Sequence, residues 1–167
     1  MDIDNQDPAA AALAVLDRLG IAYTRHDHPP VFSVDEALLH WRGIDAAHCK
    51  NLFLRNKKGN RHYLVVAEHN RAVSLQRVAE IVGDDRLSFG SEERLMRYLG
   101  LTPGSVSPLG LINDTAKHVR VVVDAGLRER PRVGFHPNVN TATIVMATAD
   151  FARFLDWSGQ PVQWAAL

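Results

Sequence analysis

The stretch from Val133 to Met146 constrains the fold more than any other part of the sequence, because it sets dense polar chemistry beside a hydrophobic strand. Its first residues are typical of extended chain. Pro137 biases His136 towards extended geometry and cannot donate a hydrogen bond to a sheet. The apolar run that begins at Thr143 then predicts a buried strand. We therefore expect a strand, a polar turn and a second strand in succession.

The polar side chains of this turn need partners, because a buried polar group without a hydrogen bond is costly. The turn contains His136, Asn138, Asn140 and Thr141 within a few residues. Asn often bonds its own backbone in turns, so these residues could simply hold the turn together. They could equally belong to a functional site. The spacing alone leaves both interpretations open.

Length and composition indicate one ordinary globular domain spanning residues 1–167, with 46% hydrophobic and 23% charged residues. Cys49 is the single cysteine, which excludes a disulfide or a thiolate metal cluster within the chain. The histidines show no metal-ligand spacing, and no Walker motif or dinucleotide fingerprint is present. The sequence therefore predicts neither a metal site nor a cofactor.

The net charge is zero, so the chain as a whole gives no argument for a nucleic-acid partner. The segment from Lys50 to Arg61 is nevertheless basic and contains no acidic residue. Such a segment can hold a phosphate backbone locally, or it can be a solvated loop. The start at Met1–Asp4 lacks an apolar signal core, and no apolar run approaches the length of a membrane span. We expect a cytoplasmic protein.

Helical and extended patterns interleave along the chain. Asp7-Pro8 predicts a helix start, and Ser33-Val34-Asp35-Glu36 has the form of a capping box. The run Tyr63–Ala67 is continuously apolar, as in a central strand covered on both faces. We expect helices over residues 7–20, 33–42, 74–82, 91–100 and 148–157, and strands over residues 21–28, 51–56, 62–67, 87–89, 118–124 and 162–164. This pattern predicts an α/β domain with a mixed sheet.

Beyond the His136 stretch, three segments could carry chemistry: Lys50-Asn51, the loop from Gly104 to Pro108, and Asn113-Asp114. Lys50 precedes an apolar strand, so its ammonium either reaches out to water or meets an anion. A glycine-containing loop can present backbone N–H groups to an oxyanion or a phosphate, and it can also be a plain tight turn.

These separated motifs resemble one known family, the trans-editing aminoacyl-tRNA deacylases, which include YbaK and the insertion domain of bacterial prolyl-tRNA synthetase. The matching residues are Lys50-Asn51-Leu52-Phe53-Leu54, Gly104-Ser105-Val106-Ser107-Pro108 with Gly110-Leu111-Ile112-Asn113-Asp114, and His136-Pro137-Asn138-Val139-Asn140-Thr141-Ala142-Thr143. Asn51 after the Lys and the Ser-Pro-x-Gly-Leu run are closest to the freestanding alanyl-tRNA(Pro) deacylase branch, called ProX. The cysteinyl-tRNA(Pro) branch usually carries Thr after that Lys.

The resemblance implies a mixed, barrel-like sheet flanked by helices, no metal, and hydrolysis of the ester between a small amino acid and the terminal tRNA ribose. It gives catalytic roles to Lys50, Gly104 and His136, with Asp114 the nearest candidate for a general base. The substrate-binding residues that it implies are Asn51, Ser105, Pro108, Asp114, Asn138, Asn140 and Thr141. The basic hairpin residues Lys57, Lys58 and Arg61 are the candidates for contacts with the tRNA backbone. We also expect the helix over residues 33–42 to close the pocket.

The implied partners are the acceptor stem of tRNA(Pro) and, as a further candidate, prolyl-tRNA synthetase; nothing in the sequence supports DNA binding. A pocket that admits proline cannot exclude alanine sterically, so a second, smaller pocket completes a double sieve. Two alternatives stay open. One is a deacylase of the same family acting on cysteinyl- or seryl-tRNA, and the other is a non-catalytic RNA-binding or regulatory module on this fold.

Overall fold

The computed structural model describes residues 7–167, so the predicted lack of a signal core at Met1–Asp4 lies outside the described residues. The first helix, α1 (Pro8–Arg18), begins as expected. The Asp7 carboxylate accepts a hydrogen bond from the backbone N–H of Ala9 (3.1 Å), and Pro8 occupies the first helical position. Within the described residues no helix is long and apolar enough to cross a bilayer.

Three further helices begin at a serine whose hydroxyl caps the first turn, as the sequence predicts. Ser33, Ser74 and Ser91 each accept a hydrogen bond from the backbone N–H three residues later. The helices that follow these serines are α2 (Val34–Trp41), α3 (Leu75–Val82) and α4 (Glu92–Leu99). The remaining helical segments are η1 (Pro108–Asn113), η2 (Ala125–Glu129) and α5 (Thr148–Ser158).

The strands form one mixed sheet, which confirms the expected fold class. They are β1 (Tyr23–Asp27), β2 (Ala47–Arg55), β3 (His62–Glu68), β4 (Ser88–Phe89), β5 (Val119–Asp124), β6 (Arg132–Phe135), β7 (Ala142–Ala147) and β8 (Val162–Ala165). Their order is β1-β7-β6-β2-β3-β5-β8, with β4 beside β2. The pairs β2–β6, β3–β5 and β5–β8 are parallel, and the others are antiparallel.

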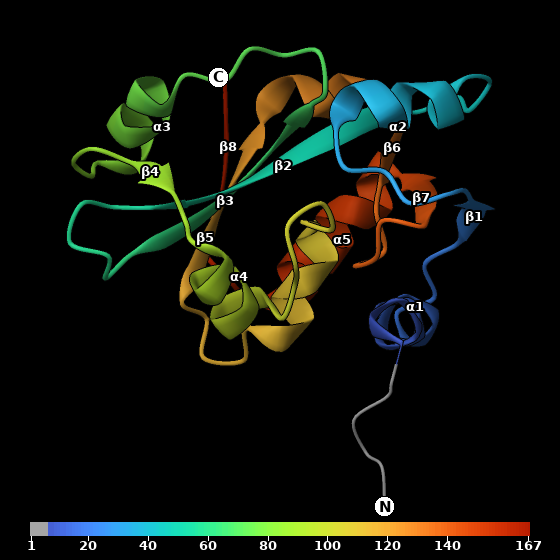
Figure 1. Cartoon of the computed structure of the whole chain (residues 1–167), viewed down its shortest axis with the longest axis horizontal. Helices are drawn as coiled ribbons and strands as arrows, with labels where there is room; N and C mark the ends of the chain where they lie inside the picture. The colour runs from blue at the N-terminus through green and yellow to red at the C-terminus, as the bar shows by residue number, and fades with distance from the viewer. Residues whose placement is uncertain (1–6) are drawn as a thin grey trace, which may run out of the picture.

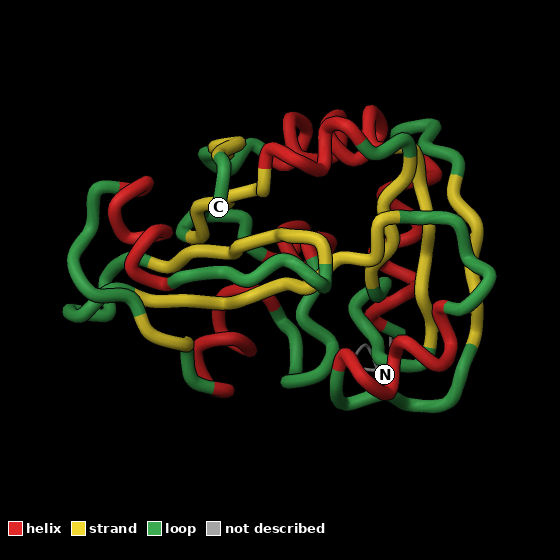
Figure 2. The backbone as a smooth tube through the Cα atoms, turned by 90° about the horizontal axis from the view of Figure 1, so that it is seen from above, coloured by secondary structure: helices red, strands yellow, loops and turns green. Residues whose placement is uncertain are grey.

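The long strand β2 joins two halves of the sheet. It begins at Ala47, four residues before the predicted start, because Ala47 and His48 pair with β6. From Cys49 onwards β2 pairs with β3 instead. Figure 2 shows the consequence: the strands of the two halves run in clearly different directions and wrap around a shared interior.

One hydrophobic core fills this interior. It takes side chains from both halves of the sheet, such as Phe53 and Phe135, and from α1, α4 and α5. The opposite face of the β2–β3–β5 half is covered by α3 through Val78 and Ala79. Helix α2 contributes a smaller cluster in which Ala37 and Trp41 pack on Val31. In Figure 1, α2 lies over one end of β2, and the β2–β3 hairpin projects from the other end.

Among residues 7–167, no strand pairs with one edge of β2 along its middle. On that edge β6 reaches only His48, and β4 pairs with β2 only from Leu54 onwards. The backbone N–H of Gly90 donates to the Phe53 carbonyl on this side (2.9 Å). Because backbone groups alternate sides along an antiparallel strand, those of Asn51 also point towards the unpaired edge. The sheet thus leaves backbone donors and acceptors open beside α2.

Candidate active site

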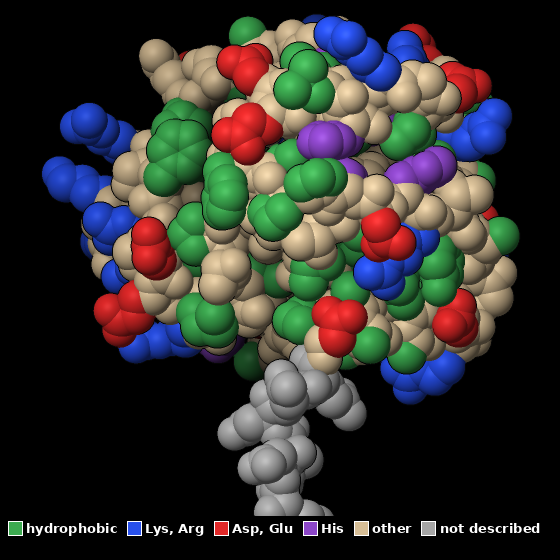
Figure 3. All heavy atoms as spheres, turned by 45° about the vertical axis from the view of Figure 1, so that its right-hand side comes forward, with side chains coloured by type: hydrophobic (Ala, Val, Ile, Leu, Met, Phe, Trp, Pro, Cys, Tyr) green, Lys and Arg blue, Asp and Glu red, His purple; other side chains and the backbone are tan. Residues whose placement is uncertain are grey.

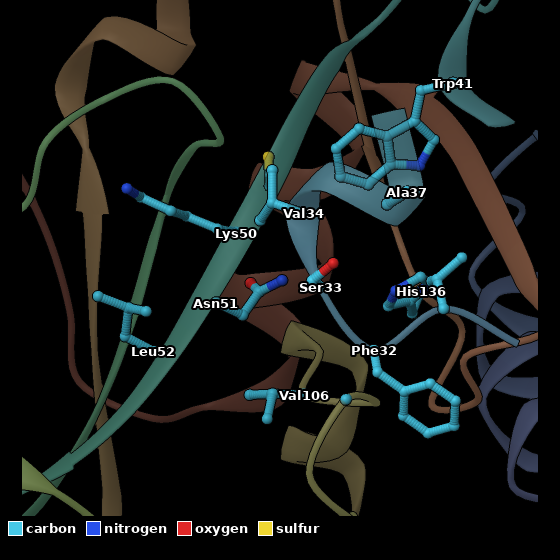
Figure 4. A pocket seen from close by; sticks show the side chains of 13 residues that line it. Phe32, Ser33, Val34, Ala37, Trp41, Lys50, Asn51, Leu52, Val106 and His136 are labelled. Atoms are coloured by element: carbon cyan, nitrogen blue, oxygen red, sulfur yellow. The ribbon is translucent and has the colours of Figure 1, made fainter. Parts of the chain in front are cut away.

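A cavity of about 300 Å³ lies at the unpaired edge of β2. Its walls come from α2 and the loop before it, from β2, from the loop after α4, and from the end of β6 (Figure 4). The volume is at the small end of ligand-binding sites. The lining residues are Val31, Phe32, Ser33, Val34, Ala37, Trp41, Cys49, Lys50, Asn51, Leu52, Gly104, Val106 and His136.

Asn51 lines this cavity, and its side chain carries an unpaired polar atom. Its side-chain oxygen is buried and has no hydrogen-bond partner among the described residues. Figure 4 shows the Asn51 amide on the Ser33 side of β2, with its nitrogen nearer to Ser33 than its oxygen. Leaving a buried amide oxygen unpaired costs free energy, so such a group in a cavity is suited to a ligand that donates a hydrogen bond.

Lys50 leaves β2 on the face opposite to Asn51, as Figure 4 shows. This follows from the alternation of side chains along a strand. The side chain is half-buried, and it forms no ion pair or hydrogen bond within residues 7–167. Its ammonium is therefore free to meet an anion, but at the rim of the cavity rather than beside His136.

His136 has a fixed orientation and an open ring nitrogen. Its Nδ1 lies 2.9 Å from the carbonyl oxygen of Ala142, a contact that requires the proton to be on Nδ1. Nε2 is then a free acceptor, and the ring lies in the cavity wall (Figure 4). Burial lowers the pKa of His136, partly offset by the bond to Ala142, so the imidazole is neutral at pH 7.

Cys49 also lines the cavity, but its chemistry is suppressed. Burial raises the pKa of the thiol to about 12, and nearby Glu68 adds to the effect. The thiolate is the nucleophilic form of cysteine, and at neutral pH this side chain stays protonated. Cys49 therefore acts as a small apolar wall residue.

The loop that forms one cavity wall is tied to the His136 turn. Asn140 donates through Nδ2 to the Val31 carbonyl (3.1 Å), and its own carbonyl accepts from the Val31 N–H (3.2 Å). The backbone N–H of His28 donates to the carbonyl oxygen of Thr141 (3.0 Å). Asn140 and Thr141, expected to bind substrate, thus position the wall instead of lining the cavity.

Thr143 anchors the same wall from β7. Its hydroxyl oxygen accepts from Trp41 Nε1 (3.1 Å) and lies 2.9 Å from Nε2 of His28. The His28 ring stacks on His40 with centroids 5.2 Å apart and lies 6.0 Å from the ring of His136. Figure 3 brings the α2 and β1 side forward and shows histidines in the upper half of this face, with hydrophobic side chains around them.

Four of the predicted site residues meet at the cavity: Lys50, Asn51, Gly104 and His136. Gly104 has φ +87°, and a Cβ there would lie 3.7 Å from Phe32 and from the Val31 carbonyl. The left-handed backbone favours glycine at this position.

The remaining predicted residues of the two loops do not line the cavity. Pro108 begins η1, and Ser105 is buried beside it. Asn138 is buried in the His136 turn with φ +63°. Asp114 is the clearest correction, because its carboxylate accepts hydrogen bonds from the backbone N–H groups of His118 (3.0 Å) and Val119 (2.8 Å). It holds the entry to β5 and does not line the cavity, so it is no candidate for a general base.

The basic hairpin has acidic neighbours in space, although it has none in the sequence. Arg61 lies 3.9 Å from Asp84, and the backbone N–H of Lys57 donates to Asp85 (3.1 Å). Lys57 and Lys58 are exposed at the tip, about 20 Å along β2 from Lys50. This hairpin is therefore less electropositive than its sequence suggests.

Sequence reasoning expected α2 to close the pocket, and α2 does line the cavity through Val34, Ala37 and Trp41. It did not single out Val31 and Phe32 as wall residues, and it assigned Trp41 only to packing. Pairing partners far along the chain, Asn140 and Thr143, bring these residues to the site. No group of three or more His, Cys, Asp or Glu within residues 7–167 is arranged to hold a metal ion.

Solved structures define the class of fold. One protein described as hypothetical superposes with a TM-score of 0.72 at 18% identity, over 92% of this chain and 96% of its own. A second, described as a proposed trans-editing enzyme for prolyl tRNA synthetase, gives a TM-score of 0.70 at 19% identity, over 96% and 98% of the two chains. The mixed sheet with its flanking helices is thus the fold of this structural group.

Sequence comparison then gives the family. Residues 28–154 match the family described as the aminoacyl-tRNA editing domain. The prolyl-tRNA editing protein ProX of Acetoanaerobium sticklandii is 41% identical over 93% of this chain and 94% of its own length. The prolyl-tRNA synthetase associated domain-containing protein 1 of Xenopus laevis is 37% identical over 88% and 89%. The chain belongs to the aminoacyl-tRNA editing domain family.

Proposed function

We propose that this chain is a trans-editing hydrolase that deacylates mischarged tRNA(Pro), with alanyl-tRNA(Pro) as its substrate. The observation that carries the proposal is the small cavity that gathers Lys50, Asn51, Gly104 and His136. The similarity to a prolyl-tRNA editing protein supports the same assignment. Cytoplasmic localisation and an association with prolyl-tRNA synthetase remain predictions from the sequence.

His136 is the residue best placed to act on the ribose. An aminoacyl ester is already activated, so a site has to place a water molecule, stabilise an oxyanion and orient the ribose. The free Nε2 of neutral His136 can accept a hydrogen bond from a ribose hydroxyl. The lining residues of the cavity include no carboxylate. The hydroxyl held by His136 then positions the water for attack on the ester carbonyl.

Asn51 and the open backbone edge of β2 hold the aminoacyl group. The Asn51 side-chain oxygen accepts a hydrogen bond from the α-ammonium group of the substrate. Backbone N–H groups at this edge and at Gly104 are donors for the oxyanion that develops on the ester carbonyl. Preorganised backbone donors of this kind need no reorganisation during the reaction.

Lys50 has two possible anionic targets, the terminal phosphate of the tRNA and the oxyanion. Its orientation away from His136 favours the phosphate. We expect Lys50→Ala to lower kcat/KM for alanyl-tRNA(Pro) about tenfold, the loss of one charge-assisted contact. The ester 3′-O-alanyl-adenosine, which has no phosphate, should be hydrolysed by Lys50→Ala as fast as by the wild type. A similar loss on both substrates would assign Lys50 to the oxyanion.

The walls of the cavity supply the size selection. Val31, Val34 and Trp41 enclose the space next to Asn51. A pocket of this kind admits the methyl group of alanine and rejects the proline ring, whereas a synthetase pocket made for proline cannot reject alanine. The tip residues Lys57 and Lys58 and the partly neutralised Arg61 are the candidates for contacts with the acceptor-stem backbone, where they add affinity without selecting the amino acid.

A panel of aminoacyl-tRNA substrates tests the proposal. Alanyl-, cysteinyl-, seryl- and prolyl-tRNA(Pro) are incubated with the wild type and with His136→Ala, and ester loss is followed under single-turnover conditions. We expect rapid loss of alanine, little loss of proline and a large reduction in the variant. Preferred release of cysteine or serine would reassign the substrate. Absence of turnover with every ester, despite RNA binding, would leave a non-catalytic RNA-binding module as the function.

A further inference from the structure

Two arginine side chains without an acidic partner meet over the β2–β3 turn. A Cβ built on Gly59 would lie 2.7 Å from Nη2 of Arg94 and 3.0 Å from Nη1 of Arg55. The two guanidinium groups are therefore close neighbours, one from the end of β2 and one from α4. Within residues 7–167 neither forms an ion pair, in contrast to Arg61, which pairs with Asp84 on the same hairpin.

Arg94 is held in place by bonds that leave one nitrogen open. Its Nη1 donates to the Gly59 carbonyl (2.8 Å) and lies 3.0 Å from Nε2 of His62. Burial, with the Arg94 charge as a second cause, lowers the pKa of His62 to about 4, so His62 is neutral and accepts this bond. Tyr98 packs against the His62 ring at 4.1 Å. The Nη2 group of Arg94 is thus preorganised and has no acceptor among residues 7–167.

Such a pair of cations is suited to an anion that bridges them. Like charges at short range repel each other. An anion between the two guanidinium groups is attracted by both, and this attraction offsets their repulsion. Guanidinium groups offer paired N–H donors that match the oxygen atoms of a phosphate. Gly59 has φ +71° and no side chain, which leaves the space over the turn to the two arginines. The exposed Lys57 and Lys58 lie at the same end of the hairpin.

We propose that Arg55 and Arg94 form a binding site for a phosphodiester group of an RNA strand. The proposal rests on the proposed function for the identity of the anion. Asn51 and Arg55 are four residues apart on β2, so their side chains share one face and lie about 13 Å apart along the strand. An RNA strand whose terminal ester enters the cavity therefore passes Arg55 a few nucleotides from its end.

The test uses Arg55→Glu, which places a carboxylate beside Arg94. The new ion pair replaces the repulsion between two cations, so the fold is retained and the melting temperature stays equal or rises. The probe is an RNA hairpin that copies the acceptor stem and carries no amino acid. Its binding is measured by fluorescence anisotropy at several salt concentrations. We expect binding about fivefold weaker than that of the wild type, and a salt slope smaller by about one. Arg55→Ala should show the same direction with a smaller change.

Arg120→Glu is the matched control, because Arg120 is an exposed arginine on β5 and the change in net charge is identical. Equal weakening by Arg55→Glu and Arg120→Glu, or no binding of the hairpin by the wild type, overturns the site. The site would also be overturned if an acidic peptide competed with the labelled hairpin for Arg55 more effectively than unlabelled RNA. That result would point to a protein partner.

Because the RNA probe carries no amino acid, this test is independent of hydrolysis. Binding that depends on Arg55 in a protein without esterase activity would reject the proposed function and keep the phosphate site. Hydrolysis of alanyl-tRNA(Pro) together with RNA binding that is insensitive to Arg55 would keep the proposed function and reject the phosphate site.

Discussion

Two asparagines, Asn51 on β2 and Asn56 directly after its end, show how one residue type serves a site and a scaffold. Asn56 is buried, and its oxygen accepts from the backbone N–H groups of Asn60 and Arg61 (both 3.1 Å). Its amide nitrogen donates to Asn60 Oδ1 (2.7 Å) and lies 3.4 Å from Asp84 Oδ1. Asn51, five residues earlier, has a buried oxygen with no partner in the described chain. The satisfied amide closes a turn, and the unsatisfied one faces a cavity.

The comparison teaches that one residue type can be committed to a turn at one position and left open beside a cavity at another, which residue identity alone does not reveal. A buried amide that has all its partners contributes to stability and has no capacity left for a ligand. An amide left open is tolerated because the surrounding sheet fixes its position. The same distinction removes Asp114 from the site and keeps His136 in it.

The largest expected effect concerns the cavity beside Asn51. His136→Ala should lower kcat/KM for alanyl-tRNA(Pro) by about 10²- to 10³-fold, the range for loss of a residue that handles a proton in the reaction. His26→Ala, on β1, is the control and should retain full activity. A loss of less than about fivefold, well under that range, would remove His136 from the mechanism.

Substitution of Asn56 should change the stability of the protein and leave its activity unchanged. Asn56→Ala removes several bonds of a buried amide, so we expect the free energy of unfolding to fall by about 2 kcal/mol. The quantity is measured by urea denaturation, with kcat/KM measured on the remaining folded protein. Asn60→Ala, which loses fewer bonds, should cost less. If Asn56→Ala impaired catalysis at full stability, the division between the two asparagines would be wrong.

Asn51→Ala should give the opposite pattern. The Asn51 side chain makes no hydrogen bond within the described part of the chain, so none is lost and the melting temperature should stay equal or rise. We expect kcat/KM to fall about tenfold or more, because the substrate loses one hydrogen bond to a buried acceptor. Melting and single-turnover rates are compared with those of Asn56→Ala. Normal hydrolysis would show that the open oxygen is not used by the substrate.

The smallest effect concerns pH. Burial lowers the pKa of His136 from its ordinary value of 6.5, and the neutral imidazole is the form that accepts a hydrogen bond. A depressed pKa keeps this form populated as pH falls, so kcat/KM should stay level from pH 8 to 6.5 and decline only below 6.5. An inflection above pH 6.5 that is absent in His136→Ala would contradict the assigned environment.

The sequence predicted the elements of the fold closely, since caps and periodicity are local properties. Ser33, Ser74 and Ser91 begin helices where expected. The start of β2 was placed too late, because Ala47 and His48 owe their extended form to pairing with β6, which a local pattern does not reveal. Sheet curvature and the gap beside Asn51 depend on contacts between distant strands and were likewise beyond the sequence.

The candidate site was predictable in part. Lys50, Asn51, Gly104 and His136 were singled out from motifs and do line the cavity. Asp114 was included from the family resemblance, as the nearest candidate for a general base, and only the tertiary structure shows that its oxygens accept from the backbone at the start of β5. The directions of Lys50 and Asn51 follow from strand alternation, yet which face meets a cavity depends on the tertiary fold.

The paired bonds between Val31 and Asn140 have a consequence for how such a site can evolve or be redesigned. One bond joins backbone to backbone and the other joins the Asn140 amide to the Val31 carbonyl, so neither uses the Val31 side chain. Substitution at Val31 or Val34 should therefore change which aminoacyl group fits the cavity while the position of His136 is kept. Directed variation of those two wall positions is the natural route to an enzyme that clears a different misacylated residue.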